Sequence, residues 1–371
     1  MRPLRVGIFT EVYRPIRNGV VGSVETLLHE LTKRGVDATC SAPWYPGSDA
    51  GGPRVRRLAS LPLPTRTGYR LVLPYAPIDR TRTILHAHSP FVTGELARRA
   101  ARGAAIPLVF TYHTRLEAYA HYAPLAAGVA RAGLRALARR YANAADVVVV
   151  PTHAIARDLR GIGVRSRIEV VPTGIDVAAF AGAAREREMR ARLGAAGDAS
   201  LVLCVGRLAR EKNVPLALAA FAALRDPHAR LALVGEGPER GRFEAHAREL
   251  GIAARVCFAG AIDSARMAAV YAAGDALLFS STTETQGLVI CEALAAALPI
   301  VAVATPVTTE LLAANARIVA ADPRALAAAL ADVLAGRRPA PPPRAALARL
   351  DRRAMTDRLL EIYASAEVTD H

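Results

Sequence analysis

Residues 5–43 read RVGIFTEVYRPIRNGVVGSVETLLHELTKRGVDATCSAP and combine two hydrophobic patterns. The apolar runs at 5–10 and 37–43 are short enough for buried strands. Between them, apolar residues recur at helical spacing until Gly35, which is a typical residue for the end of a helix. A strand, a helix and a second strand in this order predict a parallel sheet with helices packed on its faces.

The same alternation runs along the chain and then starts again. It reaches a strand at 168–172, is interrupted by the turn residues of 172–180, and restarts with a strand at 200–208. Doubly wound units bind ligands where the carboxyl ends of their strands meet helix N-termini. We therefore predict an α/β fold of two Rossmann-like, doubly wound domains facing a cleft, which cover 1–172 and 181–340 and are followed by a helix over 344–366.

The composition is that of a globular protein with a large core. The chain has 371 residues, of which 52% are hydrophobic, so disorder is excluded and two domains are expected. No stretch approaches the ~18 consecutive apolar residues of a membrane-spanning helix, and the first residues lack the apolar stretch of a signal peptide. The four cysteines are far apart, which favours free thiols in a reducing compartment. We expect a cytoplasmic protein.

Positive charge is concentrated in the first half of the chain. The formal net charge is +15; residues 1–180 hold 25 basic and 12 acidic residues, a difference of +13, and residues 181–371 hold 23 and 21, a difference of +2. Such asymmetry is typical of proteins that bind nucleic acid or a membrane surface. An arginine-rich composition is the alternative, but it does not explain the asymmetry.

Two loops of the second domain carry groups suited to a phosphorylated sugar. In GRLAREKN, which follows a strand end, the guanidinium of Arg207 and the ammonium of Lys212 suit a diphosphate. In TETQGLV, after another strand end, Gly287 lets the backbone approach a ligand closely. The amides of Gly287 and Leu288 would then point at the ligand from a helix N-terminus.

Two glutamates flank this glycine. Glu284 is placed to accept hydrogen bonds from sugar hydroxyls, and Glu292, eight positions further on, from a ribose diol. The alternative for the basic pair is two solvated loop cations. The alternative for either glutamate is a partner of the helix dipole.

The first domain offers a glycine loop and a histidine at strand ends. Gly19, in IRNGVVGSVETL, would let the backbone approach a diphosphate; the G-x-x-G spacing is not the dinucleotide fingerprint, and an ordinary tight turn is the alternative. His113 lies just past a strand and precedes Tyr119, His121 and Tyr122, an aromatic and polar loop suited to an acceptor. A structural histidine is the alternative.

A helix predicted over 124–143 carries a basic stripe. Three of its arginines recur at i, i+4 and i+8, with a fourth beside them: Arg131, Arg135, Arg139 and Arg140. A basic amphipathic helix is typical of a membrane-surface element. The alternative is a solvated outer face.

These motifs together resemble a known enzyme family. GRLAREKN, the E-x7-E spacing of TETQGLVICEALAAALPIV, the glycine loop NGVVGSVETLLHELTKRG and the segment TYHTRLEAYAHY resemble the retaining nucleotide-sugar glycosyltransferases of family 4, which have the GT-B fold. The resemblance covers nearly the whole chain in the same order. Within the family, the chain is most similar to the 1,2-diacylglycerol 3-glucosyltransferases, and the phosphatidylinositol mannosyltransferases are the nearest alternative.

The resemblance implies a role for each matching residue. Arg207 and Lys212 would hold the donor diphosphate, with Gly19 beside it. His113 and Glu284 would contact the transferred sugar as catalytic residues. The other donor contacts would be Gln286, Gly287, Leu288 and Glu292, the last of them on the ribose.

Two further features follow from the resemblance. The helix over 344–366 would cross back to the first domain. Where the family usually has Ala-Gly before a proline, this chain has Ala297 and Leu298, and we expect a change in packing there.

The resemblance also implies the reaction. A hexose would pass from a nucleotide-sugar, UDP-glucose or alternatively GDP-mannose, to a lipid hydroxyl such as that of diacylglycerol, with retention of configuration. The chain has no Asp-x-Asp motif, so we expect neither metal nor cofactor if cations and helix-end amides take the charge of the leaving diphosphate.

Several alternatives stay open at the level of sequence. They are a soluble acceptor, a related sugar epimerase and a basic nucleic-acid-binding protein, although no nucleic-acid-binding module is recognisable. We expect no nucleic-acid partner and a peripheral enzyme on the inner face of the cell membrane, which binds an anionic lipid surface. The sequence leaves the oligomeric state open.

Overall fold

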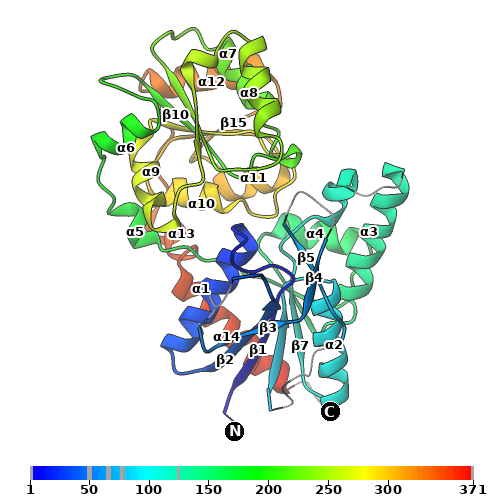
Figure 1. Cartoon of the computed structure of the whole chain (residues 1–371). Coiled ribbons are helices and arrows are strands. Elements are labelled where there is room, and N and C mark those ends of the chain that lie inside the picture. The colour runs from blue at the N-terminus through cyan, green and yellow to red at the C-terminus, as the bar shows by residue number, and fades with distance from the viewer. Residues whose placement is uncertain are drawn as a thin grey trace. The chain divides into compact units, whose positions relative to one another are not determined.

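The computed structural model describes residues 3–47, 52–63, 68–75, 79, 81–122 and 126–368. The chain forms two compact units (Figure 1). Unit 1 comprises Met1–Gly174 and Arg352–His371, and unit 2 comprises Ile175–Asp351. The chain therefore passes between the units within the turn-rich stretch at 172–180.

Unit 1 is built on a seven-stranded parallel sheet. Its strands, in sheet order, are β3 (Val55–Leu58), β2 (Asp37–Pro43), β1 (Arg5–Phe9), β6 (Ile84–Ala87), β7 (Leu108–Thr111), β8 (Val147–Val150) and β9 (Arg167–Val170). The strand β8 consists of four buried valines. Strands of this kind are apolar throughout because helices cover both faces of a parallel sheet.

Helices pack on both faces of this sheet. They are α1 (Gly19–Lys33), α2 (Val92–Ala104), α3 (Ala127–Ala142), α4 (His153–Gly161) and α14 (Arg352–Val368), with a 3₁₀ helix, η1, at Leu116–Tyr122. On one face, Leu27 of α1 and Tyr363 of α14 lie in one cluster with Val109 of β7. On the other, the ring of Tyr141 of α3 meets Phe110 of β7 with a centroid distance of 4.8 Å. Neighbouring residues of β7 thus point to opposite faces.

Unit 2 is built on a six-stranded parallel sheet. Its strands, in sheet order, are β12 (Val256–Gly260), β11 (Arg230–Val234), β10 (Leu201–Val205), β13 (Ala276–Phe279), β14 (Ile300–Val303) and β15 (Arg317–Val319). Its helices are α5 (Val177–Ala181), α6 (Arg187–Arg192), α7 (Val214–Ala223), α8 (Arg240–Glu249), α9 (Met267–Ala273), α10 (Leu288–Ala295), α11 (Pro306–Leu312), α12 (Pro323–Leu334) and α13 (Arg344–Ala348). Three 3₁₀ helices are η2 (Arg210–Lys212), η3 (Ala253–Arg255) and η4 (Ser264–Arg266).

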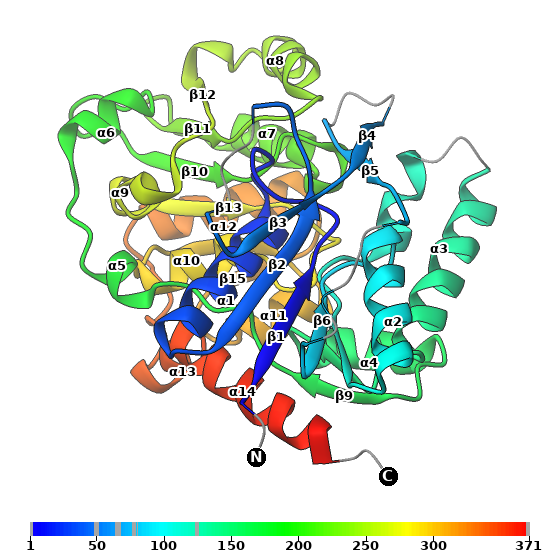
Figure 2. The ribbon, with the colours of Figure 1, turned by 60° about the horizontal axis from the view of Figure 1, so that its bottom comes forward.

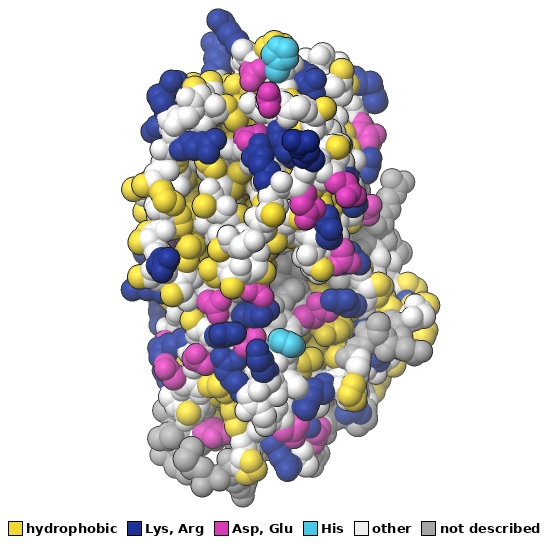
Figure 3. Space-filling model, turned by 90° about the vertical axis from the view of Figure 1, so that its left-hand side faces the viewer, with side chains coloured by type: hydrophobic (Ala, Val, Ile, Leu, Met, Phe, Trp, Pro, Cys, Tyr) yellow, Lys and Arg dark blue, Asp and Glu magenta, His cyan; other side chains and the backbone are white. Residues whose placement is uncertain are grey.

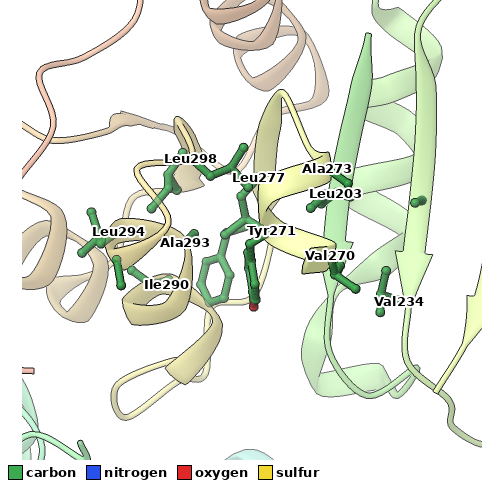
Figure 4. Close-up of a cluster of buried hydrophobic side chains, with 14 of the residues drawn as sticks. Leu203, Val234, Val270, Tyr271, Ala273, Leu277, Ile290, Ala293, Leu294 and Leu298 are labelled. Atoms are coloured by element: carbon green, nitrogen blue, oxygen red, sulfur yellow. The ribbon is translucent and has the colours of Figure 1, made fainter. Parts of the chain in front are cut away.

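Two hydrophobic clusters cover the two faces of this second sheet. Leu203 of β10 belongs to the cluster with Tyr271 of α9 and Ile290 of α10, which Figure 4 shows in close-up. The preceding residue, Val202, belongs to the other cluster, with Phe221 of α7. The doubly wound arrangement predicted from the alternation of strands and helices is therefore confirmed in each unit.

The predicted C-terminal helix over 344–366 is wrong as a single element. The structure breaks it into α13 and α14. At the break, Leu350 is buried in the core of unit 2, and its carbonyl accepts a hydrogen bond of 2.8 Å from the amide of Ile175. A helical periodicity cannot reveal this interruption, because the partner of Leu350 lies far away in the sequence. Beyond the break, α14 belongs to unit 1.

The departure at Ala297 and Leu298 also has a backbone consequence; Leu298 is buried in the core of unit 2, and the expected change in packing stays a prediction. Ala297 has a φ of 51°, in the left-handed region. Its amide donates to the carbonyl of Leu294, and the amide of Leu298 donates to that of Ala293. These two bonds form the Schellman motif that ends α10, in which glycine usually occupies the position of Ala297.

A separate antiparallel pair of strands was not predicted. Strand β4 (Ser60–Pro62) pairs with β5 (Arg70–Val72) in a two-stranded sheet outside the seven-stranded one, as Figures 1 and 2 show. Each strand has three residues, which is too few for periodicity to distinguish from loop. Within the described residues, no helix combines the length and the apolar composition that crossing a bilayer requires.

Candidate functional site

The loops that follow β10 and β13 meet at one edge of the sheet in unit 2. These two strands are parallel neighbours, so their carboxyl ends lie together. The hydroxyl of Ser280 donates to the carbonyl of Lys212 at 3.0 Å, and those of Ser281 and Thr283 donate to the carbonyl of Glu211 at 3.2 and 3.1 Å. Side-chain hydroxyls of one loop thereby fix the backbone of the other.

Each of the two predicted basic side chains is held by a carboxylate. The ammonium of Lys212 forms a hydrogen-bonded ion pair with Glu284; the two side chains are 29% and 16% exposed. The guanidinium of Arg207 donates to Glu211 at 2.7 Å, and the Glu211 side chain is almost fully buried. The structure therefore brings Lys212 and Glu284 together. Sequence reasoning missed Glu211, although its i+4 spacing from Arg207 is typical of an ion pair.

A second glycine loop supports the segment that carries Arg207. The amide of Leu208 donates to the carbonyl of Glu236 at 2.9 Å, and the carbonyl of Leu208 accepts from the amide of Glu239 at 3.0 Å. A Cβ atom on Gly237 would lie 2.3 Å from the Leu208 carbonyl oxygen, so only glycine fits there. Sequence reasoning missed this loop, whose signal was the G-x-G pattern after a predicted strand.

Helix α10 begins at the edge formed by these loops. Gly287 has a φ of 76° and immediately precedes Leu288, the first helical residue. Among the described residues, no side chain caps this helix start. Gln286 is buried, and its amide donates to the sulfur of Cys291 at 3.3 Å. The expected donor contacts of Gln286 and Leu288 stay predictions.

Glu292 lies on α10 and is oriented by a buried tyrosine. The hydroxyl of Tyr271 donates to a carboxylate oxygen of Glu292 at 2.6 Å, and the Tyr271 side chain, shown in Figure 4, is fully buried. Burial raises the pKa of Glu292, while this hydrogen bond lowers it. Sequence reasoning missed Tyr271, because α9 and α10 meet only in the folded unit. A ribose contact by Glu292 stays a prediction.

Three histidines gather in unit 1 around the ends of β6 and β7. Nδ1 of His88 lies 2.7 Å from Nε2 of His113. His86 joins Tyr363 of α14 through Nδ1 and Thr111 through Nε2, both at 2.6 Å. The rings of His88 and His113 stack with centroids 5.0 Å apart. Sequence reasoning found only His113; the signal for the others was the H-x-H pattern at a strand end.

Burial keeps these histidines neutral. It lowers the pKa of His86 to about 3 and that of His113 to about 4, and it holds the pKa of His88 well below its usual range. Two neutral rings can share one hydrogen bond if one donates and the other accepts. Nε2 of His88 is buried without a hydrogen-bond partner among the described residues. This favours a proton on Nδ1 of His88, because an unpaired buried acceptor is less unfavourable than an unpaired N–H.

The remaining predicted residues of unit 1 are placed as follows. Gly19 is the first residue of α1, which Asn18 caps by accepting a hydrogen bond of 2.9 Å from the amide of Val21. Tyr119 lies in η1 and is partly exposed. The side chains of His121 and Tyr122 lie outside the described part of the structure.

The basic stripe lies on α3 and is exposed. Its four arginines are all exposed, while Ala130, Ala138 and Tyr141 form the buried side of the helix. Exposure agrees both with a membrane surface and with a solvated face, so the membrane role stays a prediction. Figure 3 draws the left-hand side of Figure 1, not the side that carries α3; there basic and acidic side chains are interspersed.

Comparisons with known proteins agree with this architecture. Residues 17–179 match the family described as Glycosyltransferase Family 4, and residues 185–352 match the glycosyl transferases of group 1. The chain is 29% identical over 331 residues to the alpha-monoglucosyldiacylglycerol synthase of Streptococcus pneumoniae. This alignment covers 83% of this chain and 73% of the synthase. It is 33% identical over 314 residues to a GDP-mannose-dependent alpha-mannosyltransferase of Mycobacterium tuberculosis. This second alignment covers 81% of this chain and 79% of the mannosyltransferase.

Solved structures show the same fold. A sucrose-phosphate synthase from Thermosynechococcus elongatus superimposes with a TM-score of 0.79 at 20% identity and covers 99% of this chain and 100% of its own. The HepE protein of Anabaena, in complex with UDP and glucose, superimposes with a TM-score of 0.76 at 18% identity, with 98% and 100% covered. The matched families, the relative at 33% identity and the two doubly wound units lead to one conclusion: the chain belongs to family 4 of the glycosyltransferases, with the GT-B fold.

Proposed function

We propose that this glycosyltransferase moves a hexose from a nucleotide-sugar to a hydroxyl group of a membrane lipid such as diacylglycerol. The observation that carries the donor half is the ion pair of Lys212 and Glu284 at the strand-end edge of unit 2, beside the start of α10. The similarity to alpha-monoglucosyldiacylglycerol synthases supports the acceptor half and glucose as the transferred sugar, and UDP-glucose is our first candidate for the donor.

The ion pair is suited to respond to the donor. A diphosphate carries more charge than one carboxylate, so it competes with Glu284 for the ammonium of Lys212. Glu284, once released, accepts hydrogen bonds from the sugar hydroxyls. Arg207 adds a fork of donors, and the first amides of α10 add a partial positive charge. Binding of the donor would thus create the sugar contact that the free enzyme lacks.

The same groups stabilise the leaving diphosphate. As the glycosidic bond breaks, negative charge grows on the phosphate oxygen, and the fixed cations and amides lower the energy of that charge. We expect no metal ion for this step. We expect retention of configuration, with the departing phosphate oxygen taking the proton of the acceptor hydroxyl on the same face. We assign no carboxylate nucleophile.

His113 would contact the transferred sugar as a neutral ring. Its hydrogen bond with His88 fixes the orientation of the imidazole, and burial keeps it uncharged near neutral pH. A neutral ring forms hydrogen bonds with a sugar hydroxyl and does not bring a cation close to the departing glycosyl group.

A second donor is favoured by a separate observation. The mycobacterial relative at 33% identity is a GDP-mannose-dependent alpha-mannosyltransferase. GDP-mannose is therefore the second candidate, and the lipid-acceptor proposal does not depend on which of the two nucleotides is bound.

The experiment is a screen of labelled donors. Purified enzyme is incubated with radiolabelled UDP-glucose or GDP-mannose and with either a lipid extract or soluble sugar acceptors. We expect the label from one donor to enter the organic phase, and the product to keep the anomeric configuration of the donor. Label found only on soluble acceptors would contradict the lipid half of the proposal.

A further inference from the structure

The ribbon of β4 and β5 has its apolar side outward. Leu61 and Leu71 are opposite each other in the strand register and are 56% and 43% exposed. The neighbouring pair, Ser60 and Val72, is 8% and 0% exposed. Since successive side chains of a strand point to opposite faces, the leucines form the outer face.

This outer face continues past the strand ends. The amide of Leu63 donates to the carbonyl of Tyr69, and that of Leu73 to the carbonyl of Ala59, so the pairing extends by one position at each end. We call the outer face the ribbon face; it consists of Ala59, Leu61, Leu63, Tyr69, Leu71 and Leu73. None of its six side chains carries a charge, and at least half of them are exposed.

Polar contacts on the inner side hold the ribbon in this orientation. Arg70 donates to the carbonyl of Ser60 at 2.6 Å and to its hydroxyl at 3.0 Å, and that hydroxyl donates to the carbonyl of Trp44 at 2.7 Å. The guanidinium of Arg70 also lies 5.3 Å from the centre of the Trp44 ring. A shift of register by one residue would bury the leucines but would break all of these contacts. The exposure of the leucines is therefore built into the ribbon.

Exposed apolar side chains are concentrated around the ribbon. In the described part of the chain, seven large hydrophobic side chains are at least 36% exposed, and all of them belong to unit 1. Three of the seven, Leu61, Leu63 and Leu71, lie on the ribbon face. A concentration of this kind marks a binding surface.

The charges nearby identify the partner. Between Asp49 and Asp79 the sequence has five arginines and no acidic residue. Arg56 is exposed and Arg54 partly exposed on the segment that leads into the ribbon, whereas Arg57 and Arg70 donate to backbone carbonyls. Exposed leucine side chains within such a basic segment suit the boundary of an anionic bilayer, where apolar groups enter the acyl region and guanidinium groups stay among the phosphates. The stripe on α3 can supply charge, and the ribbon face supplies apolar area.

We propose that the ribbon face docks on an anionic lipid bilayer and places Leu61 and Leu71 at the boundary of the acyl chains. This inference rests on the lipid acceptor proposed above. Docking of the ribbon face would bring that acceptor within reach of the enzyme. Membrane docking is measured without turnover, so its failure is distinguishable from failure of the proposed reaction.

The first test places a fluorescent probe on the ribbon face. The chain has one tryptophan, so Leu61→Trp in a Trp44→Phe background reports from that face alone. Vesicles of phosphatidylcholine and phosphatidylglycerol should shift its emission to the blue, and brominated acyl chains should quench it. The control is Val129→Trp in the same background, at a residue of α3 that is 64% exposed. An unchanged spectrum for the Leu61 probe would overturn the proposal.

The second test removes apolar area. Leu61→Thr with Leu71→Thr should weaken partitioning onto these vesicles by about 30-fold, since two leucines lose their contact with the acyl boundary. Val129→Thr, the matched control, should change it by less than about twofold. Both leucines are exposed, so the melting temperature of the double variant should equal that of the wild type. If the double variant fails to fold, each single variant is tested for vesicle binding instead.

The outcomes separate the possible occupants. Equal vesicle binding by the double variant and wild type would overturn the proposal. A wild-type dimer that the double variant converts to a monomer would assign the ribbon face to a second copy of the chain and would also overturn it. With detergent-dispersed diacylglycerol, the double variant should keep wild-type activity; absence of transfer by both proteins would refute the proposed function instead.

Discussion

Replacing Lys212 by alanine tests the donor site most directly. In the free enzyme the ammonium of Lys212 neutralises Glu284, and its carbonyl is fixed by the hydroxyl of Ser280. The change to alanine removes the charge but leaves the backbone bond in place. Any loss of nucleotide binding then reports on the ammonium group.

The size of the effect follows from the burial of the pair. The side chains are 29% and 16% exposed, between a surface pair and a buried one, so Lys212→Ala should lower the free energy of unfolding by about 1–2 kcal/mol. Loss of a charge-assisted hydrogen bond to the diphosphate should remove about 1.5–3 kcal/mol of binding free energy. That corresponds to a Kd raised by about 10- to 150-fold.

Calorimetry with UDP and with GDP measures this change. The matched control is Arg210→Ala, because Arg210 belongs to the same 3₁₀ helix but is 57% exposed and pairs with Glu239. We expect the control to change nucleotide affinity by less than about threefold. A Kd unchanged in Lys212→Ala, or raised equally in both variants, would refute the assignment of Lys212 to the diphosphate.

Four further predictions follow. His113→Ala should lower turnover by about 10²-fold, which steady-state kinetics measures. It also leaves Nδ1 of His88 buried without its partner, so urea denaturation should show the free energy of unfolding lowered by about 1–3 kcal/mol. The pKa values of His86 and His113 in the folded state, about 3 and about 4, lie below the unfolded value of ~6.5. As the pH falls, the unfolded chain therefore takes up protons first, so the free energy of unfolding should be greatest above pH ~6.5 and should decrease towards pH ~4. A free energy of unfolding that stays constant over that range would contradict this. Ala297→Gly should raise the free energy of unfolding by about 1 kcal/mol, because glycine adopts the left-handed conformation without strain, and a lower melting temperature would be evidence against it. Transfer activity should persist in EDTA, and activity that returns only with added magnesium or manganese would disprove metal independence.

The sequence alone determined the class of fold and the positions of its principal loops. Apolar runs of strand length, such as VVVV at 147–150, alternate with helical periodicity, and this alternation is a local property of the chain. The glycines and charged residues that follow the strand ends are also read locally, which is why Arg207, Lys212 and Glu284 could be assigned to one edge before the structure was known. The family resemblance rests on these same short segments.

Only the tertiary structure decided which side chains meet. Tyr271 orients Glu292 across two helices, and His88 meets His113 across two neighbouring strands. These pairs are far apart in sequence, and periodicity gives no information about partners at that distance.

The break before α14 and the outward leucines of β4 and β5 show the same limit. The helix ends where Leu350 bonds to Ile175, and the ribbon is oriented by the contacts of Arg70 with Ser60 and Trp44. In both places hydrogen bonds to residues outside the local stretch of sequence fix the backbone, because a buried polar group left unpaired is costly. Hydrophobic periodicity carries no information about such partners.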